Sequence, residues 1–65
     1  MLKSSFRVVA DLFGADGSCV THVVRTDIKA YREVEKEIAR IRTNPPKEYE
    51  RFLKVSPRFE VGFSL

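Results

Sequence analysis

An Asp-Gly pair between two apolar runs constrains the fold of this chain more than any other feature. Residues 5–13 are rich in β-branched and aromatic side chains, which predicts a strand. Asp16-Gly17 follows, and a second apolar run extends from Cys19 to Arg25. Asp and Gly both tolerate positive φ, which a tight turn between antiparallel strands requires. The sequence therefore predicts a hairpin that turns at Asp16-Gly17.

A long helix is predicted directly after the hairpin. Thr26 or Asp27 can place a side-chain oxygen at the free amides of a first turn, and the helix is expected to run to about Arg42. At about 100° per residue, its apolar side chains fall within an arc of about 140°, enough for one buried face. This apolar stripe contains Ile28, Tyr31, Val34, Ile38 and Ile41.

The last third of the chain predicts a short helix and a strand. Asn44-Pro45-Pro46 ends the long helix, and Pro46 can begin a second helix through Lys54, since proline is favourable in a first turn. The apolar side of that helix holds Tyr49, Phe52 and Leu53. From Pro57 onward, apolar and polar residues alternate as in a strand with one buried face. The apolar members are Phe59, Val61, Phe63 and Leu65.

Together these elements predict a single α+β domain that spans residues 1–65. The element order is β-β-α-(α)-β. A right-handed crossover from the second strand to the third places the third strand beside the first. The expected fold is a small three-stranded, mainly antiparallel sheet of order 2-1-3, with one long helix packed on one face.

This chain of 65 residues is expected to have no disulfide bond or structural metal to stabilise it. Domains of this size bury only about 60% of the surface that the unfolded chain exposes, so self-association is an expected source of stability. Cys19 is the only cysteine, and no Cys/His cluster has zinc-site spacing, so we predict no disulfide, metal or cofactor. A lone cysteine, with no signal peptide and no apolar run of membrane length, predicts a soluble cytoplasmic protein.

The sheet face that the long helix leaves open is the first candidate binding surface. A two-residue turn at Asp16-Gly17 would place three cross-strand pairs on it: Phe13 with Val20, Asp11 with His22, and Val9 with Val24. Such an apolar face predicts a protein partner or a homodimer. The helix side would then hold Phe6, Val8, Ala10, Leu12 and Val23. Two alternatives remain, because the second helix can cover this face, and a one-residue slip in register would exchange the two faces.

A row of basic residues on the long helix is the second candidate. Its members fall within about 80° of one another on the helical wheel: Lys29, Arg32, Lys36 and Arg40. Such a row can follow nucleic-acid phosphates, and the net charge of +3 weakly favours anionic partners. Glu33 and Glu37 lie beside it, however, so the alternative is a solvated helix face with weak ion pairs.

No arrangement of residues predicts catalysis. His22 and Cys19 are the only residues of their types and point to opposite faces of one strand, so they cannot form a nucleophile pair within the chain. We predict a small non-catalytic protein-interaction module, of the size of a phage or mobile-element accessory protein or inhibitor that docks on a larger host protein. The alternative is a small basic nucleic-acid-binding or regulatory protein. On the first interpretation, Val9→Asp or Val24→Asp should abolish partner binding in a folded domain.

Overall fold

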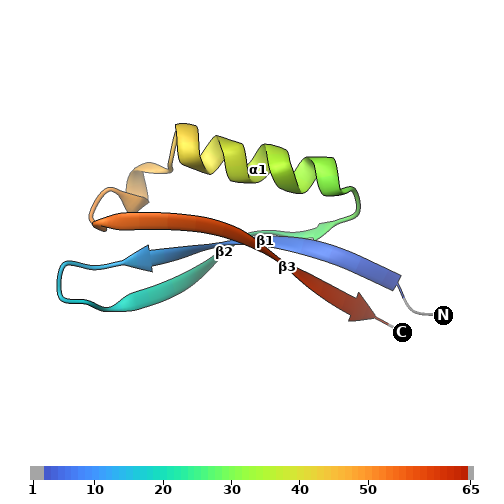
Figure 1. Ribbon diagram of the computed structural model, residues 1–65, viewed down its shortest axis with the longest axis horizontal. Helices are drawn as coiled ribbons and strands as arrows, with labels where there is room; N and C mark the ends of the chain where they lie inside the picture. The colour runs from blue at the N-terminus through green and yellow to red at the C-terminus, as the bar shows by residue number, and fades with distance from the viewer. Residues whose placement is uncertain (1–2, 65) are drawn as a thin grey trace.

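The computed structural model describes residues 3–64 as a sheet covered on one face by a helix (Figure 1). Five elements follow one another along the chain: β1 (Lys3–Phe13), β2 (Cys19–Ile28), α1 (Tyr31–Thr43), a one-turn 3-10 helix η1 (Lys47–Tyr49) and β3 (Lys54–Ser64). The strand order is β2-β1-β3 and both pairs are antiparallel. Both helices lie on the same side of the sheet, and we call the other side the open face (Figure 1). The predicted α+β fold and strand order are confirmed.

The core lies between the sheet and the two helices. One buried cluster lies between α1 and the sheet and contains Val8, Ile28, Val34 and Ile41. A second cluster lies under η1 and contains Ala10, Leu12 and Tyr49. Val24 and Val55 pack against both clusters and connect them. Alternate residues of β1 supply the sheet side of this core, as the two-residue period of a strand requires.

The helix α1 begins later than the sequence predicts. Thr26 and Asp27, the predicted caps, lie in β2, and the residue before the helix is Ala30, which makes no side-chain capping hydrogen bond. Ile28 is buried as the end of a strand rather than as the first residue of the helical stripe. The pairing of β2 with β1 is irregular beyond Val23, and such irregularities bend a strand. Asp27, the residue before Ile28, has a φ of 56°, and Ile28 is buried in the core cluster at the end of β2.

The second predicted helix is reduced to the single turn η1. Tyr49 is buried, but Leu53 is 76% exposed, and β3 begins at Lys54 rather than at Pro57. The N–H of Leu53 donates to the C=O of Phe13 at 2.8 Å. The chain is therefore already hydrogen-bonded to β1 at this point and cannot continue as a helix. The side chain of Phe63 and all of Leu65 lie outside the described part of the chain.

The hairpin turn has three residues instead of two. The N–H of Gly14 donates to the C=O of Ser18 at 2.9 Å, and the N–H of Gly17 donates to the C=O of Gly14 at 3.1 Å. Gly17 has a φ of 86°, which completes the common three-residue loop of a tight turn followed by a left-handed residue. Asp16 Oδ1 accepts hydrogen bonds from the N–H and the hydroxyl of Ser18 at 3.0 and 2.6 Å. These contacts stabilise the longer loop.

The extra loop residue shifts the pairing of β2 by one position, so the predicted register is wrong. The observed pairs are Phe13 with Cys19, Asp11 with Thr21, and Val9 with Val23. Because side chains alternate between faces, a shift of one residue moves each side chain of the strand to the other face. Val20, His22 and Val24 therefore lie on the helix side of the sheet. Val23, predicted for the helix side, lies on the open face.

Candidate protein-binding site

The structure divides the six residues predicted for one partner surface between the two faces. The open face holds Val9, Asp11 and Phe13, and the helix side holds Val20, His22 and Val24. Val9 is only 1% exposed, although it lies on the open face, because Val23 and Arg58 flank it on the neighbouring strands. Val24 packs against the core. Val9→Asp and Val24→Asp would therefore place a carboxylate among buried atoms and destabilise the domain, contrary to the prediction from sequence.

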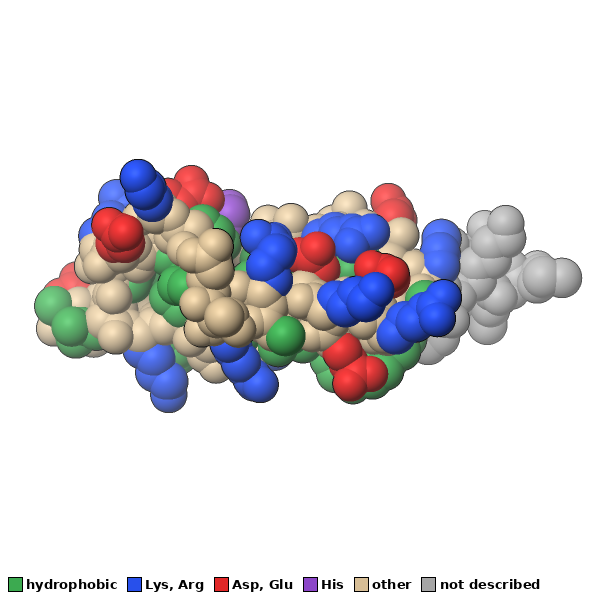
Figure 2. Space-filling view, turned by 90° about the horizontal axis from the view of Figure 1, so that it is seen from above, with side chains coloured by type: hydrophobic (Ala, Val, Ile, Leu, Met, Phe, Trp, Pro, Cys, Tyr) green, Lys and Arg blue, Asp and Glu red, His purple; other side chains and the backbone are tan. Residues whose placement is uncertain are grey.

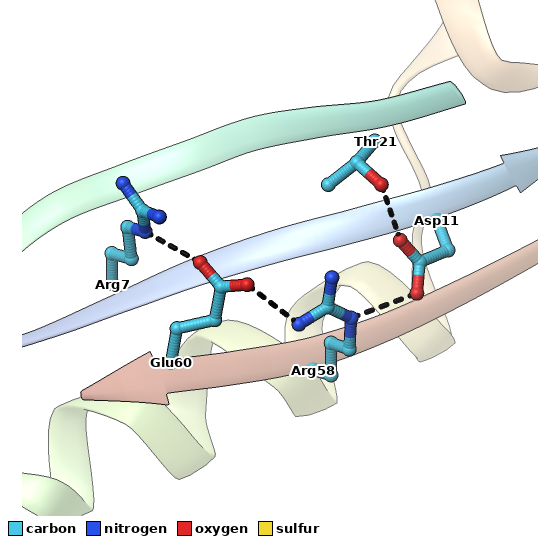
Figure 3. Close-up of polar contacts among 5 residues, drawn as sticks. All are labelled: Arg7, Asp11, Thr21, Arg58 and Glu60. Carbon is cyan, nitrogen blue, oxygen red and sulfur yellow. Dashed lines mark hydrogen bonds and ion pairs between the residues drawn. The ribbon is translucent and has the colours of Figure 1, made fainter.

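A ladder of charged side chains, rather than an apolar patch, occupies the open face (Figure 3). Arg58 is at its centre and donates from Nε to Asp11 and from Nη1 to Glu60, each at 2.8 Å. Arg7 donates to the other oxygen of Glu60 at 2.6 Å. Thr21 donates its hydroxyl to Asp11 at 2.7 Å, in the place where the sequence predicts His22. The predicted apolar character of this face is therefore wrong.

The ladder lowers the pKa of both of its carboxyl groups. The hydrogen bond from Arg58 is the largest cause for Asp11, and the hydrogen bond from Thr21 adds to it. For Glu60 the hydrogen bond from Arg58 is again the largest cause, followed by that from Arg7. The two carboxylates in turn raise the pKa of Arg58. The ladder is thus most stable in its fully ionised form.

We expect Arg58→Met to weaken the acid sensitivity of folding. Asp11 and Glu60 have lower pKa values in the folded chain than in the unfolded chain, so the unfolded chain binds protons first on acidification. The stabilisation that these two carboxylates contribute is present above their ordinary pKa values and is lost as the pH falls through the lowered pKa values of the folded chain. Urea midpoints measured between about pH 7 and about pH 2.5 should fall less steeply in the variant. Arg42→Met, which changes an exposed arginine of α1, is the control, and parallel curves for Arg58→Met and wild type would contradict the expectation.

The predicted basic row is interleaved with carboxylates. Lys36 Nζ lies 3.8 Å from Glu33, and Arg40 donates to Glu37 at 2.8 Å. Arg40 is also the largest cause of the lowered pKa of Glu37. Lys29 precedes α1 and does not lie on the helix. Basic and acidic side chains are interspersed over the helix side of the molecule (Figure 2), so this face gives a phosphate backbone no continuous basic track.

A groove opens on the helix side between β2 and η1. The helix α1 packs mainly on β3 and β1, so it leaves this side of β2 partly uncovered. We define the β2 groove by five apolar or aromatic residues: Leu12, Val20, His22, Tyr49 and Phe52. Its volume is about 210 Å³, and Val20 is 53% exposed beside it. Glu48 and Arg51, of opposite charge, also line the groove.

His22 and Tyr49 connect β2 to η1 within the β2 groove. The Nδ1 of His22 and the hydroxyl of Tyr49 are 2.5 Å apart, and the two rings are nearly perpendicular at 87°. Burial raises the pKa of Tyr49, so its hydroxyl stays protonated and can form this hydrogen bond with Nδ1. The sequence predicts His22 in a partner surface, but it predicts Tyr49 and Phe52 only on the apolar side of a helix. The sequence signal for this groove was the pair of aromatic residues, Tyr49 and Phe52, in the segment after Pro46.

The other residues that could support catalysis or metal binding do not come together in one site. Cys19 is exposed on the open face, on the side of the sheet opposite to His22. Among residues 3–64, no group of three or more His, Cys, Asp or Glu side chains is placed to hold a metal ion. Within the same part of the chain, no helix has the length and apolar character needed to cross a membrane. Comparisons with protein-family models, curated proteins and solved structures found no match.

Proposed function

We propose that this protein is a non-catalytic interaction module that binds an extended segment of a larger protein along the edge of β2. One apolar side chain of that segment would occupy the β2 groove. The observation that supports this function is the position of the groove directly beside an unpaired strand edge. Addition of a partner strand to such an edge is a common mode of peptide recognition. The small domain would act as an accessory protein or inhibitor of the protein it binds.

The edge of β2 offers backbone hydrogen bonds over residues 19–23. In an antiparallel pair, successive residues alternate between bonding to the neighbouring strand and facing away from it. The hydrogen bond from Gly14 to Ser18 defines this alternation at the turn. Continued along β2, this alternation directs the N–H and C=O groups of Cys19, Thr21 and Val23 away from β1. A partner strand can bond to these groups until the pairing becomes irregular beyond Val23.

The β2 groove supplies the selectivity that backbone bonds lack. In a strand added beside β2, every second side chain would lie on the helix side, next to Val20 and His22. Burial of one large aliphatic or aromatic side chain there would contribute about 1.5–3 kcal/mol. Glu48 and Arg51 have opposite charges, so the groove has no net charge from this pair. An apolar side chain therefore fits it better than a charged one.

We expect peptides selected from a random library on the wild-type protein to depend on both parts of this site. Val23→Pro removes an outward N–H, and Val20→Glu places a charge at the groove. Each should weaken the affinity of selected peptides at least about tenfold, measured by calorimetry. Val61→Pro, on the opposite edge of the sheet, is the matched control and should leave the affinity unchanged. Peptides that bind Val23→Pro and Val20→Glu as tightly as wild type would contradict the proposal.

The same experiment distinguishes the nucleic-acid alternative. A short mixed-sequence duplex is tested beside the selected peptides at two salt concentrations. If the duplex bound strongly at low salt, and binding fell steeply with salt and was lost in Lys36→Ala and Arg40→Ala, the basic row would be the functional surface. The interspersed carboxylates of α1 lead us to expect no such binding.

A further inference from the structure

The edge of β3 is the second free edge of the sheet, and it is more regular than that of β2. Its pairing with β1 continues over the whole strand without a register shift. Pro57 lies opposite Ala10, is buried, and has no N–H to give to β1, so its nitrogen faces away from β1. By alternation, Phe59 and Val61 also direct their backbone N–H and C=O groups away from β1. This edge can therefore pair with another strand.

Exposed apolar side chains gather beside this edge, near the start of α1. Phe59 is 39% exposed and Val61 is 47% exposed. The ring of Phe59 packs edge to face on Tyr31 at 5.4 Å and on Phe6 at 6.1 Å. Tyr31 is itself half-exposed. An ordered aromatic patch that faces water is typical of a protein interface.

The folded chain also exposes more surface than a monomer of its size usually does. Its accessible surface is 4934 Å², whereas size scaling predicts about 4,200 Å² for a monomer of 7.5 kDa. Its radius of gyration is 13.1 Å, whereas about 11 Å is typical of a compact chain of 65 residues. The excess of about 700 Å² is close to the area of about 800 Å² that each partner buries in a standard interface. The elongated shape of the sheet leaves enough additional surface exposed for one interface of this size.

We propose that β3 pairs with β3 of a second copy of this chain. The two strands would run antiparallel about a two-fold axis at Phe59 and join the two sheets into one. Phe59 would then face its own counterpart on the helix side, and the exposed aromatic patches of the two copies would meet. The interface uses the edge opposite to β2, so it is independent of the proposed peptide-binding function.

Charge complementarity selects this register among the antiparallel alternatives. With the axis at Phe59, Arg58 of each copy faces Glu60 of the other on the open face. An axis at Arg58 or at Glu60 would place like charges directly opposite each other, which is unfavourable. An axis at Val61 would set Glu60 opposite Gly62 and form no ion pair. Arg58 donates within its own chain from Nε and Nη1, so Nη2 can extend the ladder across the axis.

Pro57 makes Val61 important for the pairing. In this register Pro57 faces Val61 of the second copy, and its C=O can accept the N–H of that residue. Pro57 has no N–H to donate in return. The N–H of Val61 is therefore a donor that no other backbone group can replace in the hydrogen bonds between the two copies.

The decisive measurement is the solution mass of two matched proline variants over a concentration series. Val61 and Val23 are similarly exposed, at 47% and 46%, and both direct their N–H away from β1. Wild type and Val23→Pro should reach twice the monomer mass of 7.5 kDa, whereas Val61→Pro should stay at that mass with an unchanged circular dichroism spectrum. A wild type that is monomeric throughout, or a Val61→Pro that still forms dimers, would overturn the proposal. Either result would leave peptide binding at β2 unaffected.

A charge exchange tests the register without changing the backbone. Arg58→Glu places two acidic residues at the interface of each copy, and Glu60→Arg places two basic residues there. Each variant alone should be monomeric, and the 1:1 mixture should form heterodimers, because only then does each acidic residue face a basic one. If the mixture stayed monomeric while both variants remained folded, the two-fold axis at Phe59 would be wrong.

Discussion

Replacing Ile41 by alanine is expected to remove a large share of the free energy of unfolding of this protein. Ile41 is 1% exposed and packs with Val8, Ile28 and Val34 in the main core cluster. Substitutions of this kind cost about 2–5 kcal/mol, because the cavity left behind closes only partly. A domain of 65 residues has a total free energy of unfolding of about 3–10 kcal/mol. Denaturation with urea, followed by circular dichroism, measures the loss.

Ile38→Ala is the matched control for this prediction. Ile38 is on the same helix but only partly buried, so the same change should cost less than half as much. Both variants make the same Ile-to-Ala change in α1, so the change in helix propensity is the same in both. The difference between their free energies of unfolding therefore reports the loss of core packing. Equal losses in the two variants would show that Ile41 does not occupy the closed part of the core.

Tyr49→Ala is expected to have the second large effect on stability. Tyr49 is 4% exposed and closes the core over Ala10 and Leu12. Loss of a buried aromatic ring costs about 3–5 kcal/mol. The substitution also removes the contact between η1 and His22. Thermal unfolding should therefore show a much lower midpoint, and the β2 groove should no longer form.

Tyr49→Phe separates the ring of Tyr49 from its hydroxyl. The variant keeps the aromatic packing and removes only the hydrogen bond with His22, so it should cost about 0.5–1.5 kcal/mol. If Tyr49→Phe were as destabilising as Tyr49→Ala, the hydrogen bond rather than the ring packing would hold η1 on the sheet. That result would contradict the role assigned to the second core cluster.

The two proposed interfaces lie on opposite edges of one sheet. Because β1 is central, pairing through β3 leaves β2 and its groove free in both copies. A dimer would therefore present two peptide-binding edges at the outer limits of a continuous sheet. Two linked sites can raise the overall affinity for a partner that contains two matching segments, provided that the geometry allows both to bind at once.

Local patterns in the sequence were sufficient to predict the fold. The β-branched run of residues 5–13 corresponds to the central strand, and the spacing of Val34 and Ile41 corresponds to the buried side of α1. The strand order was predicted by placing a right-handed crossover from β2 to β3 across β1, the handedness that chain chirality favours. These features depend on neighbouring residues and on general geometry, so they could be predicted without knowledge of tertiary contacts.

The candidate site could not be predicted in the same way, because it depends on a register that local patterns leave open. An Asp-Gly pair is compatible with a two-residue or a three-residue loop, and the contacts between Asp16 and Ser18 accompany the longer one. That single residue moves Val20 and His22 to the helix side, where they meet Tyr49. Likewise, Arg58 and Asp11 are 47 positions apart, and only the pairing of β3 with β1 brings them together.

The sequence by itself determined which segments form strands and helix and which strand is central, because those choices follow from side-chain periodicity and chain chirality. Only the tertiary structure decided which side chains share a face, where α1 begins, and that residues 50–53 turn into β3 instead of continuing a helix. The physical reason is that the side-chain period of a strand is two residues. A change of one residue in a loop costs little energy locally, yet it exchanges the two faces of the strand that follows.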